Sequence, residues 1–390
     1  MQATIQQAPQ KNSRTFPPFS LARLLRTVFN PKPGERVCIL IDLEDPREVR
    51  DFRFLADPKW SIQRHAVKDF YETLRGGVLD ELGLKNGDLF AYKITGGSNR
   101  ELPDEAFATD GRALSLARDI YTNYDIILCI STYSATAPLT AHAKHFGFRG
   151  ATLHGVNDII LSTGLAVDYI EVSRAAEKLR LGMTGADSAE IDYECAGRRC
   201  TLRLELGGQE AQKSHGLVRS GEPDVANLPA GEIYYVPVSA EGEFPMKYED
   251  GTLGLCKVSG GRVRSVSLIC GSQKTIDGEN AKHADDPATG ELGELGFGTQ
   301  ELPPSGRDIQ DEKILGTLHV ATGRSDHLGG HLTPDKFAEP SKAQHDDILF
   351  SPTKTPEINV PQARLRWGDR VEVVIENYAP SAYMRGLLNA

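Results

Sequence analysis

The pattern of apolar positions divides the chain into two unlike halves. Between about residues 21 and 181, short apolar runs alternate with stretches in which apolar residues recur one helical turn apart, as Ala66, Phe70 and Leu74 do. The runs have the lengths and the Gly, Pro and Asn flanks of buried strands, at residues 37–41, 89–94, 126–130 and 150–153. Strands that alternate with helices predict an α/β layer built on a mostly parallel sheet.

A second pattern begins after residue 181, where strands follow one another across tight turns. The segment 195–200 is typical of a hairpin, and it leads into clean period-two alternation over residues 201–206. Apolar runs of the same kind recur at residues 253–258, 263–269, 363–367 and 371–375. We therefore predict an N-terminal α/β domain over residues 1–185 and a β-rich α+β domain over residues 186–390. The polar segment 277–288 is predicted to be a mobile loop.

The composition excludes several classes of protein. The chain has 390 residues and a formal net charge of −10, so it lacks the excess of Lys and Arg on which nucleic-acid binding depends. It shows no run of ~20 apolar residues for a membrane span and no apolar signal core at its start. Its six cysteines form no CxxC pair, which is typical of thiols in a reducing compartment. We expect a cytoplasmic protein with no nucleic-acid or membrane partner.

Histidine is the residue type whose distribution departs from chance. Common nucleophile and nucleotide motifs are missing from the sequence, among them GxSxG, HExxH, the Walker P-loop and GxGxxG. By contrast, four of the ten histidines lie within 27 residues, where uniform usage gives fewer than one: His319, His327, His331 and His345. Imidazole beside carboxylate is the ligand set that Zn, Co, Mn and Fe take in proteins. This stretch therefore indicates a candidate metal site.

Two segments of the stretch place metal-ligating side chains on strands. An extended backbone at residues 344–350 puts His345 and Asp347 on one face and Asp346 on the other. His319 stands in the middle of a short apolar strand, at residues 316–323. A pair of ligands two residues apart on one strand follows naturally from this spacing.

Two acids earlier in the chain stand in unusual surroundings. Glu232 and Glu294 are each embedded among glycine and apolar residues. An unpaired carboxylate is costly to bury in such a place, and a bound metal ion removes that cost. Both glutamates are therefore candidates for the same site.

In order and character, four segments resemble a known family, the thermophilic metalloaminopeptidases of the aminopeptidase T and aminopeptidase S group. The resemblance implies an N-terminal α/β domain and a β-rich C-terminal domain that holds two metal ions. It also implies that the metal ligands are Glu232, Glu294, His319, His345 and Asp347. The matching segments are Pro229–Glu232, Leu292–Glu294, Gly316–His319 and His345–Asp347.

The resemblance implies a metallohydrolase that cleaves an amide bond, most simply at an N-terminal residue, with two divalent ions such as Zn, Co or Mn. Two ions lower the pKa of a bridging water and polarise the scissile carbonyl. The substrate would be a small molecule or a short peptide. A homodimer is expected on the resemblance alone.

Several residues are candidates for moving the proton in such a reaction: Glu291, Asp326, His327 and Asp346. The family carries a tyrosine thought to serve catalysis at the position of Asp326, so the peptidase reaction itself stays open. Arg324 lies close to His319 in the sequence and could hold a substrate carboxylate through a bidentate pair.

A relative of the same fold gives a competing interpretation. The ring-opening dioxygenase for 2,5-dihydroxypyridine resembles a member of the group with one Fe(II), held by two histidines and one carboxylate. It keeps the His-x-Asp pair but lacks both glutamates. This sequence keeps Glu232 and Glu294, and five ligands suit two ions better than one facial triad. A hydrolase, an Fe(II) dioxygenase acting on a hydroxylated aromatic ring and a binding protein descended from a peptidase therefore all stand as hypotheses.

Overall fold

The computed structural model describes residues 14–219 and 221–390. These residues form three β-sheets, one of them partly parallel, and nine α-helices. The first 13 residues, part of the segment in which the sequence shows no signal core, lie outside the described residues. The chain is thus a mixed α/β protein with a β-rich C-terminal region.

The first sheet contains the strands predicted for the N-terminal half. The first five of its strands, in the order given below, run parallel, and the last two are antiparallel. The strands at residues 36–43 and 126–130 are wholly or almost wholly buried, as strands covered by helices on both faces are. The spatial order is β10 (Val225–Asn227), β6 (Arg149–Thr152), β5 (Ile126–Ile130), β1 (Arg36–Leu43), β2 (Lys85–Lys93), β3 (Glu105–Ala108) and β4 (Ala113–Ser115).

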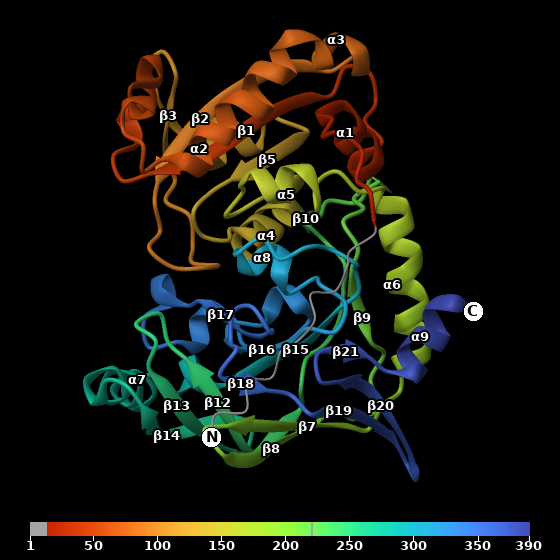
Figure 1. Ribbon diagram of the computed structural model, residues 1–390. Helices are drawn as coiled ribbons and strands as arrows, with labels where there is room; N and C mark the ends of the chain where they lie inside the picture. Colours follow the sequence, from red (N-terminus) through yellow and green to blue (C-terminus); the bar gives the residue numbers. More distant parts are fainter. Residues whose placement is uncertain (1–13, 220) are drawn as a thin grey trace.

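Helices cover this sheet, and side-chain caps fix where two of the longest begin. Ser20 accepts a hydrogen bond from the backbone N–H of Arg23, and Asp168 accepts one from Ile170. The helix that Asp168 caps runs along the side of the molecule from the first sheet toward the C-terminal strands (Figure 1). The helices are α1 (Leu21–Phe29), α2 (Ser61–His65), α3 (Leu79–Leu82), α4 (Thr136–Phe146), α5 (Asp158–Ser162) and α6 (Tyr169–Met183).

The second sheet is antiparallel and contains the predicted hairpin, because residues 195 and 198 pair across a two-residue turn. The strands expected near residues 255, 266, 365 and 373 are also present. Its main path is β14 (Arg262–Cys270), β13 (Leu253–Ser259), β12 (Ser239–Lys247), β8 (Arg198–Glu205), β7 (Ser188–Cys195), β19 (Gln362–Trp367), β20 (Arg370–Glu376) and β21 (Ala379–Pro380), with β18 (Ile358–Asn359) paired to β7.

The third sheet lies between the first two layers and carries the metal-site candidates. It is antiparallel and has the order β17 (His345–Phe350), β16 (Leu318–Gly323), β15 (Leu292–Gly298), β11 (Glu232–Tyr235) and β9 (Gln212–Ser214). Alternate residues such as Leu295, Phe297 and Val320 pack into the core shared with the second sheet. Their neighbours in sequence point the other way, toward the first sheet.

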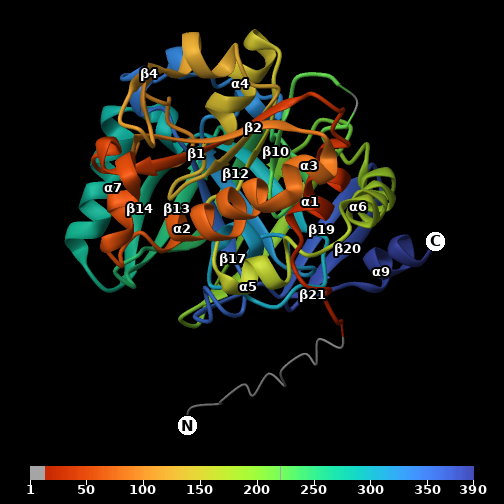
Figure 2. The same ribbon diagram turned by 90° about the horizontal axis from the view of Figure 1, so that it is seen from above.

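Three further helices complete the C-terminal region: α7 (Gln273–Asp285), α8 (Asp308–Asp311) and α9 (Ala382–Asn389). Seen from above, α6 and α9 lie on one side of the molecule and α7 lies on the opposite side beside β13 and β14 (Figure 2). The prediction of a mobile loop at residues 277–288 is wrong, because most of it is helix α7. Ser272 caps this helix by accepting from Thr275, and Ile276 packs into the core.

The first sheet also extends beyond the predicted domain boundary. Strand β10 comes from residues 225–227, yet it pairs in parallel with β6. The division at residues 185 and 186 therefore stays a prediction, and a segment from the second part of the chain completes the first sheet.

Two other expectations concern membrane-spanning helices and the state of the cysteines. In the part of the chain that the structure describes, no helix combines the length and the apolar character needed to cross a bilayer. All six cysteines are free thiols, and four of them are buried: Cys38, Cys129, Cys195 and Cys256.

Candidate metal centre and cavity

The third sheet brings all five predicted ligands together on its face toward the first sheet. Glu232 begins β11, Glu294 lies on β15, His319 lies on β16, and His345 and Asp347 lie two residues apart on β17. A register shift beside residue 293 pairs Glu294 with the strand that carries His319, so the bulge sets the direction of this carboxylate. Asp346, between the two ligands on β17, does not join the cluster and contacts Gln344 and Lys282. The alternation of side chains predicted for this strand is therefore present.

Glu294 lies at the centre of this cluster. Its Oε2 is 2.9 Å from Nε2 of His345, and its Oε1 is 3.4 Å from Nε2 of His319. Oδ1 of Asp347 is 3.1 Å from the same nitrogen of His345 and 4.0 Å from that of His319. Ligand atoms bound to one ion at about 2.0–2.2 Å lie roughly 3–3.5 Å apart. The two oxygens of Glu294 thus face two histidines at spacings close to those of metal ligands.

The donor atoms form three overlapping groups, each with all its atoms within 4.8 Å of one another. Glu294 belongs to two of them, as do His319 and Asp347, so the groups are not independent sites. The groups are Glu232 with Glu294 and His319, Glu294 with His345 and Asp347, and Glu312 with His319 and Asp347.

The orientation of His345 fits a metal ligand. Its Nδ1 donates to the backbone carbonyl of Arg324 at 2.7 Å, which leaves Nε2 directed at the carboxylates. This arrangement, in which a second contact fixes the ring, is typical of histidines that bind metals. Nδ1 of His319 is buried without a hydrogen-bond partner among the described residues, and the ring is held instead by packing against Gly296.

The cluster has a strongly negative potential. Burial disfavours charge on His319, but the hydrogen bond to Glu294 and the charges of neighbouring carboxylates raise its pKa to about 10. Burial has the same effect on His345, and Asp347 and Glu294 nevertheless raise its pKa well above the ordinary value. Surroundings that stabilise a positive imidazole also stabilise a divalent cation, so the donor set fits a metal of the Zn, Co, Mn or Fe class.

Gly296 makes room for His319, and a side chain there is expected to disturb the site. A Cβ at this position would lie 2.1 Å from Cε1 of His319. We expect Gly296→Ala to lower the affinity for metal by roughly 10- to 100-fold, as displaced ligands do, in a metal titration. Gly278→Ala is the control, because nothing lies within 4 Å of its Cβ position. Equal metal affinity in both variants would show that His319 is not a ligand.

Two charged residues in the site were not predicted from the sequence. Lys313 is 1% exposed, and its Nζ lies 2.7 Å from both Glu232 and Glu312. Burial raises the pKa of Glu312 to about 7, partly offset by the ammonium of Lys313. The signal was the run Asp311–Lys313 shortly before an apolar segment, because charges placed next to core positions are buried only when they pair with other charges. Lys313 balances part of the negative charge of the cluster.

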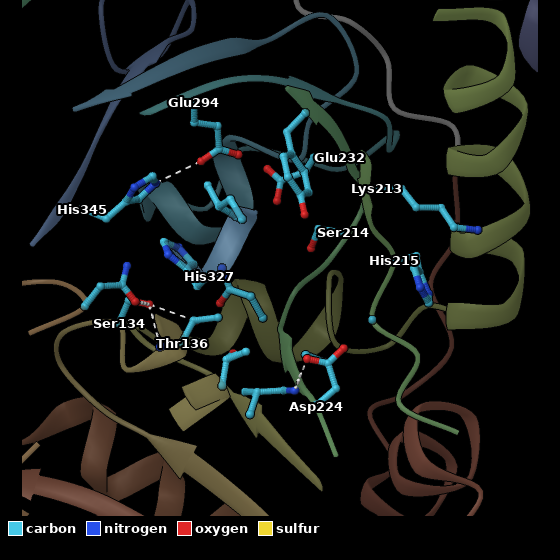
Figure 3. Close-up of a pocket in the computed structure, with 18 of the residues that line it drawn as sticks. Ser134, Thr136, Lys213, Ser214, His215, Asp224, Glu232, Glu294, His327 and His345 are labelled. Carbon is cyan, nitrogen blue, oxygen red and sulfur yellow. Dashed lines mark hydrogen bonds and ion pairs between the residues drawn. The ribbon is translucent and has the colours of Figure 1, made fainter. Parts of the chain in front are cut away.

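A cavity of about 240 Å³ opens beside the cluster, between the third sheet and the carboxyl end of the first. Glu232, Glu294 and His345 line one side, while Ser134 and Thr136 lie across from them (Figure 3). The chain continues from β1 to β2 on one side and from β5 to β6 on the other side, so the strand order reverses between β1 and β5. Open α/β sheets bind ligands beyond the carboxyl ends of the strands at such a point. His154, at the same edge, also lines the cavity with a buried Nδ1 that has no partner among the described residues.

The candidates for proton transfer lie in different surroundings. His327 lines the cavity, and its ring lies 5.0 Å from that of His345. Burial lowers the pKa of His327, which favours the neutral ring. Glu291 does not line the cavity and is paired with Arg262 at 2.6 Å and His331 at 2.9 Å. The catalytic role of each stays a prediction.

Arg324 does not hold a substrate, contrary to expectation. Its guanidinium is bidentate to Asp326 and donates to Glu101 and to the carbonyl of Asn99. Only 1% of the residue is exposed. These partners occupy the N–H groups of the guanidinium that a substrate carboxylate would need. Asp326, which this guanidinium binds, stands where the aminopeptidases carry a tyrosine.

The architecture is similar to that of a solved enzyme. The structure of 2,5-dihydroxypyridine dioxygenase from Pseudomonas putida KT2440 matches with a TM-score of 0.56 and 14% identity, over 92% of this chain and 94% of that one. No protein-family description and no curated protein matches the sequence. Identity this low shows a shared fold, and the resemblance to the aminopeptidases rests on the four short segments alone. The chain therefore has the overall fold of a dioxygenase together with a cluster of residues able to bind metal.

Proposed function

We propose that the protein is a metal-dependent hydrolase with two neighbouring ion positions that share Glu294. One position is formed with His345 and Asp347, and the other with His319 and Glu232. The observation that carries the proposal is that the two oxygens of one carboxylate face two different histidines, at 2.9 and 3.4 Å. A site for one ion needs no such bridge.

The roles of the residues follow from their contacts. Divalent ions, when bound, supply Lewis acidity and lower the pKa of a coordinated water. Glu294 and Asp347 hold the two positions together, and Lys313 balances the charge that Glu232 and Glu312 add to the cluster. His327 lines the cavity as a neutral imidazole, and so is available to take or give a proton at a ring nitrogen. The bond cleaved is an amide, most simply that of an N-terminal residue.

A second candidate function is ring cleavage by a single Fe(II), and a specific observation favours it. The solved structure with the same fold is a 2,5-dihydroxypyridine dioxygenase. His319, His345 and Asp347 also supply two imidazoles and one carboxylate, the set found in many non-haem iron oxygenases. In this case Lys313, rather than a second ion, would neutralise Glu232.

Glu232 distinguishes the two functions, because only the site with two ions requires it. We expect Glu232→Gln to bind one metal equivalent where the unaltered protein binds two, and to lose roughly 10- to 100-fold of its amide hydrolysis. Metal analysis of protein purified without added metals measures the first effect. Release of a chromogenic amine from amino-acid anilides, with and without oxygen, measures the second.

The matched control for this substitution is Glu357→Gln. Glu357 also forms an ion pair with a lysine, Lys247 at 2.9 Å, but it lies on the surface away from the cavity. This variant is expected to keep both metal content and activity. One equivalent of iron, ring cleavage that consumes oxygen and full activity in Glu232→Gln would together overturn the hydrolase in favour of the dioxygenase.

A further inference from the structure

The side of the cavity across from the metal cluster presents hydrogen-bond donors. This surface, which we call the donor wall, is formed by Asn99, Ser134, Thr136 and Asn227. Ser134 and Thr136 point toward the cavity from the start of α4, opposite Glu294 and His345 (Figure 3). Because most of its polar atoms are engaged within the protein, the few that are free show what the wall can bind.

Asn99 is held so that only its amide nitrogen is free. Its backbone N–H donates to Ser134 at 2.7 Å, and its carbonyl accepts from Arg324 at 3.1 Å. Its Oδ1 accepts from the backbone N–H of Ala137 at 2.8 Å and from the hydroxyl of Ser134 at 3.3 Å. A backbone N–H can only donate, so this contact fixes which end of the amide is oxygen. Nδ2 has no partner among the described residues.

Asn227 lines the same wall from strand β10. Its Oδ1 lies 3.3 Å from the hydroxyl of Thr152. That hydroxyl is in turn 2.7 Å from the hydroxyl of Thr136, which lies 3.0 Å from that of Ser134. The three hydroxyls thus lie in one row between the two asparagines. In the described structure Nδ2 of Asn227 makes no hydrogen bond, so each asparagine has an amide nitrogen free to donate.

The direction in which a substrate lies fixes which end meets the donor wall. In the proposed hydrolase the scissile amide lies at the metal cluster, so the other end of a small substrate reaches the opposite side of the cavity. The charged residues that line the cavity outside the cluster are Lys144, Lys213 and Asp224. Amide N–H groups on this side bind an anionic oxygen through charge-assisted hydrogen bonds.

We propose that the donor wall binds the carboxylate of the substrate, so that the enzyme acts on small amides that carry a free carboxylate one residue beyond the scissile bond. This inference rests on the proposed hydrolase function and specifies its substrate class. A volume of about 240 Å³ holds roughly eight waters at their share of liquid volume, about 30 Å³ each. A ligand of dipeptide size fits this space.

The test compares glycylglycine with glycylglycinamide, two compounds that differ only in carboxylate against carboxamide. Hydrolysis of the first with one water gives two glycines, and that of the second gives glycine and glycinamide. We expect the unaltered protein to bind glycylglycine at least about tenfold more tightly, as a charge-assisted hydrogen bond implies. Calorimetric titration measures binding, and amino-acid release measures turnover.

Asn99→Asp is the decisive variant, because it keeps the oxygen that Ala137 needs and replaces only the free donor by an acceptor. Asn99 has a positive φ of 61°, which aspartate also tolerates. We expect its KM and dissociation constant for glycylglycine to rise about tenfold or more, and those for glycylglycinamide to change less than threefold. Asn227→Asp is a second, independent variant with the same expected result. Asn377→Asp, at another positive φ outside the cavity, is the control.

The outcomes separate this inference from the proposed function. Preferred binding of glycylglycine that Asn99→Asp abolishes, without any hydrolysis, would reject the hydrolase and support the donor wall. Hydrolysis of both compounds with equal KM, unchanged in both asparagine variants, would reject the donor wall and leave the hydrolase standing. Preference for the carboxylate that persists in both variants would also overturn the assignment to Asn99 and Asn227.

Discussion

Glu294→Gln is expected to remove nearly all bound metal and at least about 10³-fold of the activity. Glutamine has the same shape but no charge, and one of its two ligand atoms becomes an NH₂ group that cannot bind a cation. In the proposed centre both ion positions depend on this carboxylate, because its oxygens face His345 and His319 separately. Metal analysis after dialysis and the anilide assay measure the two losses.

The expected effect on stability distinguishes this result from unfolding. Glu294 is 4% exposed and hydrogen-bonded to His345, and the amide oxygen of a glutamine can still accept that hydrogen bond. Glu294→Gln should therefore leave a metal-free protein that still folds. Circular dichroism should show unchanged secondary structure. Retention of two metal equivalents by a folded Glu294→Gln protein would contradict the proposed centre.

Much of the candidate site could be predicted from the sequence because its ligands lie on strands. The period-two geometry of a strand places residues i and i+2 on one face, and this rule alone placed His345 and Asp347 together. Glu232 and Glu294 were found because a carboxylate among glycine and apolar residues is costly to bury alone. That five such residues meet on neighbouring strands followed from the resemblance, and the sheet order β17-β16-β15-β11 brings them together.

Other features depend on contacts between distant parts of the chain, which no local pattern records. Lys313 is buried only because Glu232, 81 positions earlier, supplies the opposite charge. Strand β10 joins the first sheet through pairing with β6, 75 positions away in sequence. The polar segment in α7 lacks a strong apolar stripe, and it is helical because of its Ser272 cap and the packing of Ile276. The predicted homodimer rests on the resemblance and stays a prediction.

Arg324 connects the metal cluster to the donor wall. Its backbone carbonyl accepts from His345, a predicted ligand, at 2.7 Å. Its guanidinium donates to the carbonyl of Asn99, whose side chain belongs to the opposite wall. One residue therefore positions groups on both sides of the cavity, and its own charge is balanced by Asp326 and Glu101.

Arg324→Met is expected to lower the free energy of unfolding by about 3–5 kcal/mol, because it leaves the largely buried carboxylate of Asp326 without its partner. Glu101 is 39% exposed on its side chain, so water compensates for the loss of that pair. The loosened contacts to Asn99 should also weaken binding at the donor wall. Denaturant unfolding of Arg324→Met should be compared with Arg112→Met, whose exposed pair with Asp110 is worth at most about 1 kcal/mol. In Arg324→Met/Asp326→Asn the uncompensated charge is removed as well, so part of the stability should return. If the double variant is no more stable than Arg324→Met, the loss comes from packing and not from the buried charge.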